Sequence, residues 1–226
     1  MPKTYFVIKR IFDVVAAFFA TVFFLLPWAV IALIIKVQSP GPVIFKARRV
    51  GKDGKVFTLY KFRTMRVDSG DIRATTLRND SRVFRFGRFL RISKLDETPQ
   101  LINILQGHMS IIGPRPEDEE NAARIYTGKF SRILAATPGL SSPASLYDYA
   151  VGERYETEER YINEFLPKKL AVELYYVEHR ALWYDFFLIF RTVVMIAGVI
   201  LKKNVKIPWE AEKALNQSEK RSINVI

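Results

Sequence analysis

The chain has no cysteine and only two histidines, His108 and His179, among its 226 residues. The absence of cysteine excludes disulfides and thiol chemistry and is compatible with the cytosol. Two histidines are too few for a metal site built from histidine ligands. Acids are also scarce, because 23 Asp and Glu face 35 Lys and Arg, which gives a formal net charge of +12. The expected partners are therefore anionic: nucleic acid, acidic phospholipid or a phosphorylated substrate.

Charge is missing altogether from residues 14–35, which read VVAAFFATVFFLLPWAVIALII. This run is long enough to cross a bilayer as a helix, which takes roughly 20 apolar residues. It is too long for a cleavable signal peptide, and no small-residue cleavage site follows it. Pro27 lies near its middle and is expected to bend the helix, because proline removes a backbone donor.

Positive charge flanks this segment on both sides. The basic residues are Lys3, Lys9 and Arg10 upstream and Lys36, Lys46, Arg48 and Arg49 downstream. Because Lys and Arg favour the cytoplasmic side, a simple span has to translocate one basic flank. A re-entrant helix hairpin bent at Pro27 keeps both flanks inside and is the favoured interpretation. A kinked span and a buried core helix are the alternatives, the latter disfavoured because the segment lacks a polar face.

The rest of the chain predicts a small, mainly helical domain, so the fold class is α+β. Residues 43–45 and 56–60 predict the strands of a hairpin around a turn at residues 51–54. The other predicted elements are a strand at residues 109–112 and helices at residues 97–106, 117–129 and 153–177, the last broken at Pro167. Two segments predict loops: residues 67–81 and 137–149.

A basic residue recurs at every third position of residues 82–94: Arg82, Arg85, Arg88, Arg91 and Lys94. Three residues turn a helix by about 300°, so this row drifts around a helix and only some members are expected to face a site. Gly87 is expected to interrupt the helix.

A second apolar stretch, residues 183–201, contains Asp185 and Arg191, which argues against a second span. An amphipathic helix in the membrane interface fits better, and an ordinary core helix is the alternative. Its expected anchors are Trp183, Tyr184, Phe186, Phe187 and Phe190. The chain then divides into a membrane helix (1–38), a main domain (39–203) and a polar tail (204–226).

Asp96 and Glu97 stand at the start of a predicted helix, between a basic run and Arg115. A helix N-terminus keeps a carboxylate ionised and can hold a phosphate. A carboxylate can attack phosphorus to form an acyl phosphate, and nearby cations or Mg²⁺ reduce the repulsion between the two anions. The simpler alternatives are a helix cap for Asp96, a first-turn acid for Glu97 and a surface arginine for Arg115.

Taken together, several stretches resemble the bacterial sugar transferases of the monotopic phosphoglycosyl transferase type. These stretches are KRIFD (9–13), SPGPVIF (39–45), YKFRTM (60–65), GRFLR (87–91), LDETPQLIN (95–103), GHMSIIGPRP (107–116) and PG (138–139). Their order and spacing are also similar to the family's. The match as a whole is far more specific than any single motif.

The resemblance implies a re-entrant membrane helix and an active site on the cytosolic face of the bacterial inner membrane. It implies transfer of a sugar 1-phosphate from a UDP-sugar to a polyprenyl phosphate, usually undecaprenyl phosphate, with release of UMP and Mg²⁺ as cofactor. Such a reaction initiates polysaccharide or glycoconjugate assembly. The implied partners are these substrates and membrane phospholipid, not nucleic acid. A homodimer is compatible with the chain, although no motif points to one.

Residue roles follow from the same resemblance. Asp96 matches the nucleophile that carries the phosphosugar, and Glu97 matches its partner in metal or proton handling, so both are metal-ligand candidates. Arg91 and Arg115 are expected to contact phosphates. Weaker candidates for phosphate binding are Lys61, Arg63 and Lys94.

The chain departs from the family pattern at three places. Leu26 stands where many members have Ser before the membrane proline, and Ala47 stands where Gln is common. Residues 140–147 read LSSPASLY instead of a Thr-Gly-Trp-Ala-Gln type of run, so the sugar cannot be inferred from other members. A non-catalytic, membrane-anchored polyanion-binding protein is the competing reading. It explains the charge and the anchor but leaves Asp96 and Glu97 without a role.

Overall fold

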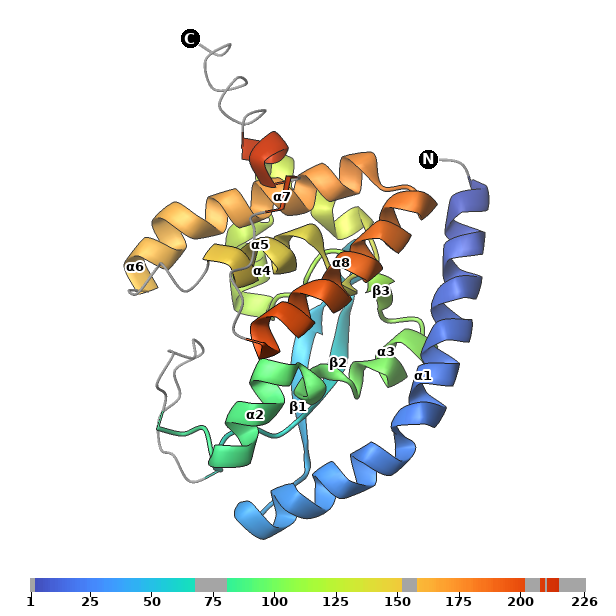
Figure 1. The fold of residues 1–226 in the computed structure, drawn as a ribbon. Helices are drawn as coiled ribbons and strands as arrows, with labels where there is room; N and C mark the ends of the chain where they lie inside the picture. Colours follow the sequence, from blue (N-terminus) through green and yellow to red (C-terminus); the bar gives the residue numbers. More distant parts are fainter. Residues whose placement is uncertain (1–2, 68–80, 152–157, 202–207, 210, 216–226) are drawn as a thin grey trace.

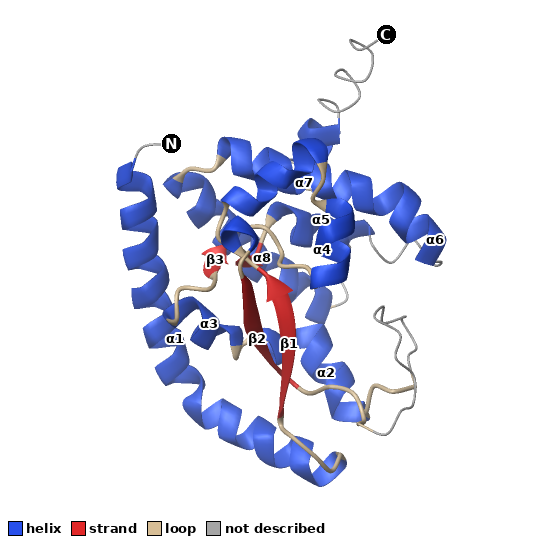
Figure 2. Cartoon of the chain, turned by 180° about the vertical axis from the view of Figure 1, so that it is seen from behind, coloured by secondary structure: helices blue, strands red, loops and turns tan. Residues whose placement is uncertain are grey.

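The computed structural model describes residues 3–67, 81–151, 158–201, 208–209 and 211–215. The predicted loop at residues 67–81 and the predicted tail at residues 204–226 lie largely outside these ranges. Within them the fold is mixed and mostly helical, with a central two-stranded hairpin surrounded by helices (Figure 2). The predicted α+β class, with a long apolar helix at the N-terminus, is confirmed at this level.

Helix α1 (Lys3–Gln38) runs along one side of the domain and then bends beneath it (Figure 1). Pro27 lies inside this helix, and a proline there accounts for a bend. The two arms diverge in both views, so α1 is an open bent helix rather than a closed hairpin (Figures 1 and 2). The side chains that α1 buries are Tyr5, Asp13, Ala17, Ile31 and Ile35, whereas most of its large apolar side chains are exposed.

The predicted hairpin is confirmed, with strands longer than the sequence indicated. β1 (Ile44–Val50) and β2 (Val56–Phe62) pair antiparallel from Ile44 with Phe62 to Val50 with Val56. The turn between them is a short 3-10 helix, η1 (Lys52–Gly54), in which Asp53 and Gly54 have positive φ angles of 56° and 75°. Aspartate and glycine tolerate this conformation better than most residues, which explains the turn.

Helix α2 (Arg85–Ser93) carries Arg85, Arg88 and Arg91 of the basic row, and Gly87 does not interrupt the helix. A Cβ atom on Gly87 would overlap the carbonyl oxygen of Thr64. The prediction was wrong because glycine here serves close packing, which lets α2 lie directly on the chain that follows β2. After α2 come the 3-10 helix η2 (Leu95–Glu97) and helix α3 (Gln100–Leu105), so the predicted helix at residues 97–106 starts later than expected.

Strand β3 (Ser110–Ile112), predicted from the sequence, pairs parallel with β4 (Gly139–Ser141), which was not predicted. Between them lie α4 (Glu119–Ile125) and the 3-10 helix η3 (Gly128–Ala135). Helix α5 (Pro143–Val151) follows β4, so the loop predicted for residues 137–149 is wrong. Ser142 Oγ accepts the Ser145 N–H at 2.9 Å, and Pro143 suits a first helical turn, which together start α5.

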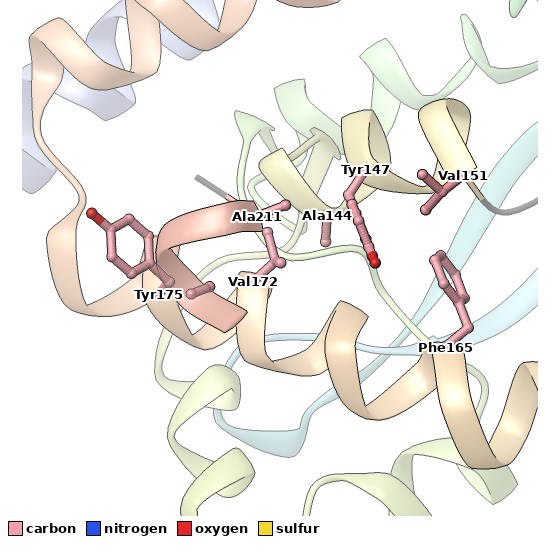
Figure 3. Packing of buried hydrophobic residues seen from close by; sticks show 8 residues of the cluster. Ala144, Tyr147, Val151, Phe165, Val172, Tyr175 and Ala211 are labelled. Atoms are coloured by element: carbon pink, nitrogen blue, oxygen red, sulfur yellow. The ribbon is translucent and has the colours of Figure 1, made fainter. Parts of the chain in front are cut away.

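The C-terminal part is formed by α6 (Glu158–Arg160), a π-helical turn η5 (Tyr161–Phe165), α7 (Leu166–His179) and α8 (Leu182–Ile200). Pro167 was predicted to break the helix, but it does not. It sits in the first turn of α7, directly after the π turn, where a missing N–H is tolerated. Tyr147 and Val151 of α5 pack against Phe165 and Val172, which buries one face of α7 (Figure 3).

Two of the described helices, α1 and α8, are long and apolar enough to cross a membrane. α8 has two unlike faces: Tyr184, Asp185, Leu188 and Met195 are buried, and the large side chains Trp183, Phe186, Phe187 and Phe190 are exposed. The helix is amphipathic as predicted, and its placement in a membrane interface stays a prediction. Tyr184 differs from the other predicted anchors. That side chain packs into the core and is not an exposed anchor.

Candidate active site

The acid pair lies in a tight turn between α2 and α3. Lys94 ends α2 in the left-handed conformation, with φ 59°, and turns the chain into η2. Asp96 was predicted at or beside the N-cap of α3. The N-cap of α3 is Pro99, and Asp96 lies in η2, the turn before the helix. The 3-10 turn places Asp96 inward, with 5% of its surface exposed. Its Oδ1 has no hydrogen-bond partner among the described residues.

Glu97 and Arg115 form an ion pair beside Asp96. Arg115 Nη2 donates to Glu97 Oε1 at 2.9 Å. Burial alone would raise the pKa of Glu97, but Arg115 and Lys94 outweigh this effect and lower it to about 2. Glu97 is therefore ionised at every physiological pH.

Asp96 responds differently to the same surroundings. Burial and the Glu97 carboxylate raise the pKa of Asp96 to about 6, against the lowering effects of Lys94, Lys61 and Arg91. At pH 7 the carboxylate is mostly ionised, yet it is poorly solvated. Two adjacent acids with pKa values pushed apart by their environments are typical of sites that divide chemical roles between carboxylates.

Three of the predicted cations surround Asp96. Lys61 is the next residue after Tyr60 on β2; burial lowers the pKa of its ammonium group, although Asp96 and Glu97 partly oppose the effect. Lys94 Nζ lies 4.5 Å from the centre of the Tyr149 ring. Arg91 Nε donates to Thr64 Oγ1 at 2.8 Å, which orients it from α2. The basic row therefore sends Arg91 and Lys94 to the site, as expected for a row that drifts around a helix.

Arg63 is placed elsewhere. Its guanidinium donates to the carbonyl oxygens of Ser39 and Pro40, just after the end of α1. These contacts hold α1 to the end of β2, and they give no support to the phosphate-binding role predicted for Arg63. Lys61, two residues earlier on β2, is the basic residue that lies near the acid pair.

Arg115 is held by its backbone as well as by Glu97. Its N–H donates to Glu173 Oε1 at 3.0 Å, and Ser142 Oγ donates to the same oxygen at 2.9 Å. Close pairing of the chain at Gly113 and Gly139, where a Cβ atom would overlap backbone, brings Pro114 against β4. Burial is the largest cause that raises the pKa of Glu173, to about 7.

Three positioning contacts were missed from the sequence. Asn103 of α3 accepts the Tyr60 N–H at 3.0 Å and donates to the Thr58 carbonyl at 2.7 Å, which fixes β2 beside Lys61. Trp28 Nε1 donates to Thr98 Oγ1 at 2.9 Å, which joins α1 to the turn that holds Asp96. The third is the contact of Glu173 with the Arg115 N–H. Of these residues, only Asn103 could have been noticed in the sequence, because it lies within the LDETPQLIN stretch.

A carboxylate pair with cations around it, on a turn that is hydrogen-bonded to a long apolar helix, is a class of arrangement that suits a phosphorylated group. The comparisons with known proteins give the family. Residues 4–198 match the model of the bacterial sugar transferase family, and the chain belongs to that family.

Several curated proteins are similar over most of this chain. A Caulobacter vibrioides protein named UDP-glucose:undecaprenyl-phosphate glucose-1-phosphate transferase is 39% identical over 191 residues, or 82% of this chain. An Escherichia coli K12 protein of the same name is 37% identical over 190 residues, again 82% of the chain. An Aeromonas hydrophila protein named UDP-N-acetylgalactosamine-undecaprenyl-phosphate N-acetylgalactosaminephosphotransferase is 34% identical over 194 residues, also 82% of the chain. The chain spans 68%, 39% and 43% of these three proteins, respectively.

Proposed function

We propose that this protein transfers a sugar 1-phosphate from a UDP-sugar to undecaprenyl phosphate and releases UMP. This would be the first membrane step in the assembly of a polysaccharide or glycoconjugate. The names of the relatives support the reaction class, and they differ in the sugar. The observation that carries the proposal is the buried Asp96 oxygen without a partner, set among Lys61, Lys94 and Arg91.

Asp96 is the proposed nucleophile. Its ionised carboxylate oxygen attacks the phosphorus that bears the sugar, a bond forms between them, and the bond from that phosphorus to the UMP oxygen breaks. UMP leaves with the bonding electrons. An oxygen of undecaprenyl phosphate then attacks the phosphorus of the aspartyl phosphosugar, and the bond to Asp96 breaks. The carboxylate is thereby regenerated, and the lipid carries a sugar diphosphate.

The surrounding side chains would make this attack feasible. Lys61, Lys94 and Arg91 reduce the repulsion between the carboxylate and the phosphate, and fixed cations in a poorly hydrated site do so without reorganisation. The ion pair with Arg115 keeps Glu97 charged. The Glu97 charge raises the pKa of Asp96, which makes the ionised Asp96 carboxylate a more basic nucleophile.

Mg²⁺ fits the residues present. Mg²⁺ is usually held by one or two carboxylates and substrate phosphates, and the described residues contain no cluster of three acidic or histidine ligands. Asp96 Oδ1 is unpartnered and Glu97 has one oxygen on Arg115, so these two carboxylates would hold the ion. When bound, it would neutralise charge on the diphosphate.

The membrane placement is part of the proposal. Helix α1 would enter the bacterial inner membrane from the cytosolic face and return at the bend, so that both basic flanks stay inside. The hydrogen bond from Trp28 to Thr98 supports this placement, because it sets the Asp96 turn beside the apolar helix. A lipid phosphate at the membrane surface would then lie within reach of the site.

The test is UMP release from a panel of UDP-sugars, with undecaprenyl phosphate and Mg²⁺, by the full chain in detergent. Wild type should release UMP with one or a few donors, and Asp96→Asn should release none. Asp53→Asn, in the exposed hairpin turn, is the matched control and should behave as wild type. A radiolabelled sugar phosphate should remain on wild-type protein when the acceptor is omitted.

Two outcomes would contradict the proposal. Full turnover by Asp96→Asn would remove the nucleophile assignment. Failure of every donor, with protein shown to be folded and membrane-bound, would favour the non-catalytic polyanion-binding alternative.

A further inference from the structure

A cavity with a volume of about 230 Å³ lies beside the N-terminal turns of α1. Side chains from α1, η1, β3 and the C-terminal end of α7 form its wall. The ionisable cations and acid in that wall are Lys9, Arg10, Asp13, Lys52 and Arg180. Its described lining includes no residue of the acid pair or of the cations around it. The cavity is therefore a feature that the proposed transfer reaction leaves unexplained.

The cavity and the candidate active site lie at opposite ends of the hairpin. Lys61 pairs with Phe45 at one end of the hairpin, whereas Lys52 belongs to the turn at the other end. Val56, next to the turn, precedes Lys61 by five residues on β2. At roughly 3.3 Å per strand residue, the two ends lie roughly 17 Å apart. A ligand the size of one phosphate cannot occupy both places.

Most charges in the wall are already committed. Lys9 Nζ lies 3.0 Å from Asp185 Oδ2. The Arg10 guanidinium donates to the carbonyl oxygens of Ile104 and Leu105 at 2.6 and 3.1 Å, which caps α3. These two basic side chains are structural, because they fasten α1 to α8 and α3.

Asp13 is committed as well. Its Oδ1 accepts the Ile111 N–H at 3.1 Å, and its Oδ2 accepts the Ser110 hydroxyl at 2.7 Å. Both oxygens hold β3 against α1. The one acid in the described wall is thus engaged by neutral donors and forms no ion pair with a cavity cation.

Lys52 and Arg180 are different. Within the described part of the chain neither forms an ion pair, and Arg180 Nε is buried without a hydrogen-bond partner. The guanidinium lies 5.2 Å from the Phe6 ring, which holds it at the cavity. A buried donor without a partner is costly, so its persistence points to a ligand that accepts hydrogen bonds.

We propose that this cavity binds a phosphate group, either free or in the headgroup of an anionic phospholipid. Pockets for drug-sized ligands usually measure about 300–1,000 Å³, so this smaller volume suits one phosphate better than a UDP-sugar. Arg180 supplies planar N–H donors for phosphate oxygens, and Lys52 supplies a point charge. The exposed Val7, Ile8 and Ile11 on the same turns of α1 would suit the acyl chains of a lipid.

The test compares thermal unfolding of the full chain in neutral detergent with and without inorganic phosphate, at constant ionic strength. The variants are the double substitution Lys52→Gln with Arg180→Gln, and Lys168→Gln as a control on the exposed face of α7. Tenfold excess of phosphate over its Kd should raise the midpoint of wild type and control by about 3–6 °C more than that of the double variant. If the double variant does not fold, Lys52→Gln alone replaces it in the comparison, because Lys52 lies in an exposed turn.

A second arm separates the two sources of phosphate. The same proteins are placed in phosphatidylcholine nanodiscs with or without phosphatidylglycerol. Selective stabilisation of wild type and control by phosphatidylglycerol assigns the site to a lipid headgroup, and phosphate stabilisation without it assigns the site to the free anion. Equal shifts for wild type and the cavity variants, with both probes, would overturn the proposal. UMP release is not a readout here, so this result does not depend on the proposed transfer reaction.

Discussion

Arg115 and Glu97 form an ion pair across 2.9 Å that leaves Asp96 as the titratable member of the acid pair. The pair also fixes the position of Arg115, whose backbone N–H is bonded to Glu173. Arg115 therefore connects the acid turn to α7, through its guanidinium on Glu97 and its backbone N–H on Glu173. Because the Arg115 side chain is 38% exposed, we expect the ion pair to contribute more to catalysis than to the stability of the fold.

Arg115→Gln should lower the rate of UMP release by about 100- to 1,000-fold, the usual effect of removing one electrostatic donor from an active site. The substitution leaves Glu97 without its cation, so the pKa of Glu97 should rise from about 2. Arg132→Gln is the matched control, because its guanidinium pairs with Glu178 at 2.8 Å on the outer surface. A rate for Arg115→Gln within twofold of the control would contradict the role given to this arginine.

The pH dependence of kcat/KM should show an acidic limb near pH 6. Asp96 must be ionised to attack, and burial together with Glu97 raises its pKa to about 6, so activity falls about tenfold per pH unit below that value. Lys94→Gln removes a cation that lowers this pKa, and the limb should therefore move to higher pH. Lys168→Gln should leave the limb in place. A Lys94→Gln limb at or below the wild-type position would refute the assignment to Asp96.

Local patterns predicted the hairpin and a basic row of which only some members face the site, whereas the roles of Asp96, Glu97 and Arg91 were predicted from the family resemblance. Turn residues, strand composition and helix periodicity report on neighbours along the chain, and the hairpin and the row depend on such neighbours. Helix α5 was missed although Ser142 and Pro143 are a good helix start, because the small polar residues around them resembled a loop.

Contacts between distant residues could not be predicted from these patterns. Trp28 meets Thr98 across 70 positions, and Arg115 meets Glu173 across 58. In the sequence, nothing distinguishes Trp28 from the other apolar residues of the predicted membrane segment, or Glu173 from the other acids of a predicted helix. Their roles come from tertiary packing, which gives a single sequence no local signal.

Asp96→Asn should stabilise the folded protein at alkaline pH. The pKa of Asp96 is raised from 3.8 to about 6, so the fold disfavours the ionised form and bears this cost above pH 6. A shift of that size corresponds to about 3 kcal/mol at most, and the gain should shrink as the pH falls from 6 towards 4, where wild-type Asp96 is protonated too. Thermal unfolding at pH 8 and pH 5 measures it, with Asp53→Asn as control. A lower unfolding midpoint for Asp96→Asn than for wild type at pH 8 would contradict the free-energy cost assigned to the ionised Asp96 carboxylate.

Glu173 should act as a positioning residue for Arg115. Glu173→Gln keeps the oxygen that accepts the Arg115 N–H and the Ser142 hydroxyl, so UMP release should stay within a few-fold of wild type. Glu173→Ala leaves both donors unpaired in the interior, which costs about 1–3 kcal/mol per group and frees Arg115 to move. Its kcat should fall at least tenfold while the KM for the UDP-sugar changes less, because Arg115 is displaced without loss of the other cations. Measuring kcat, KM and the unfolding midpoint together separates the two effects: a lower midpoint with unchanged kcat would mean that Glu173 supports only the fold.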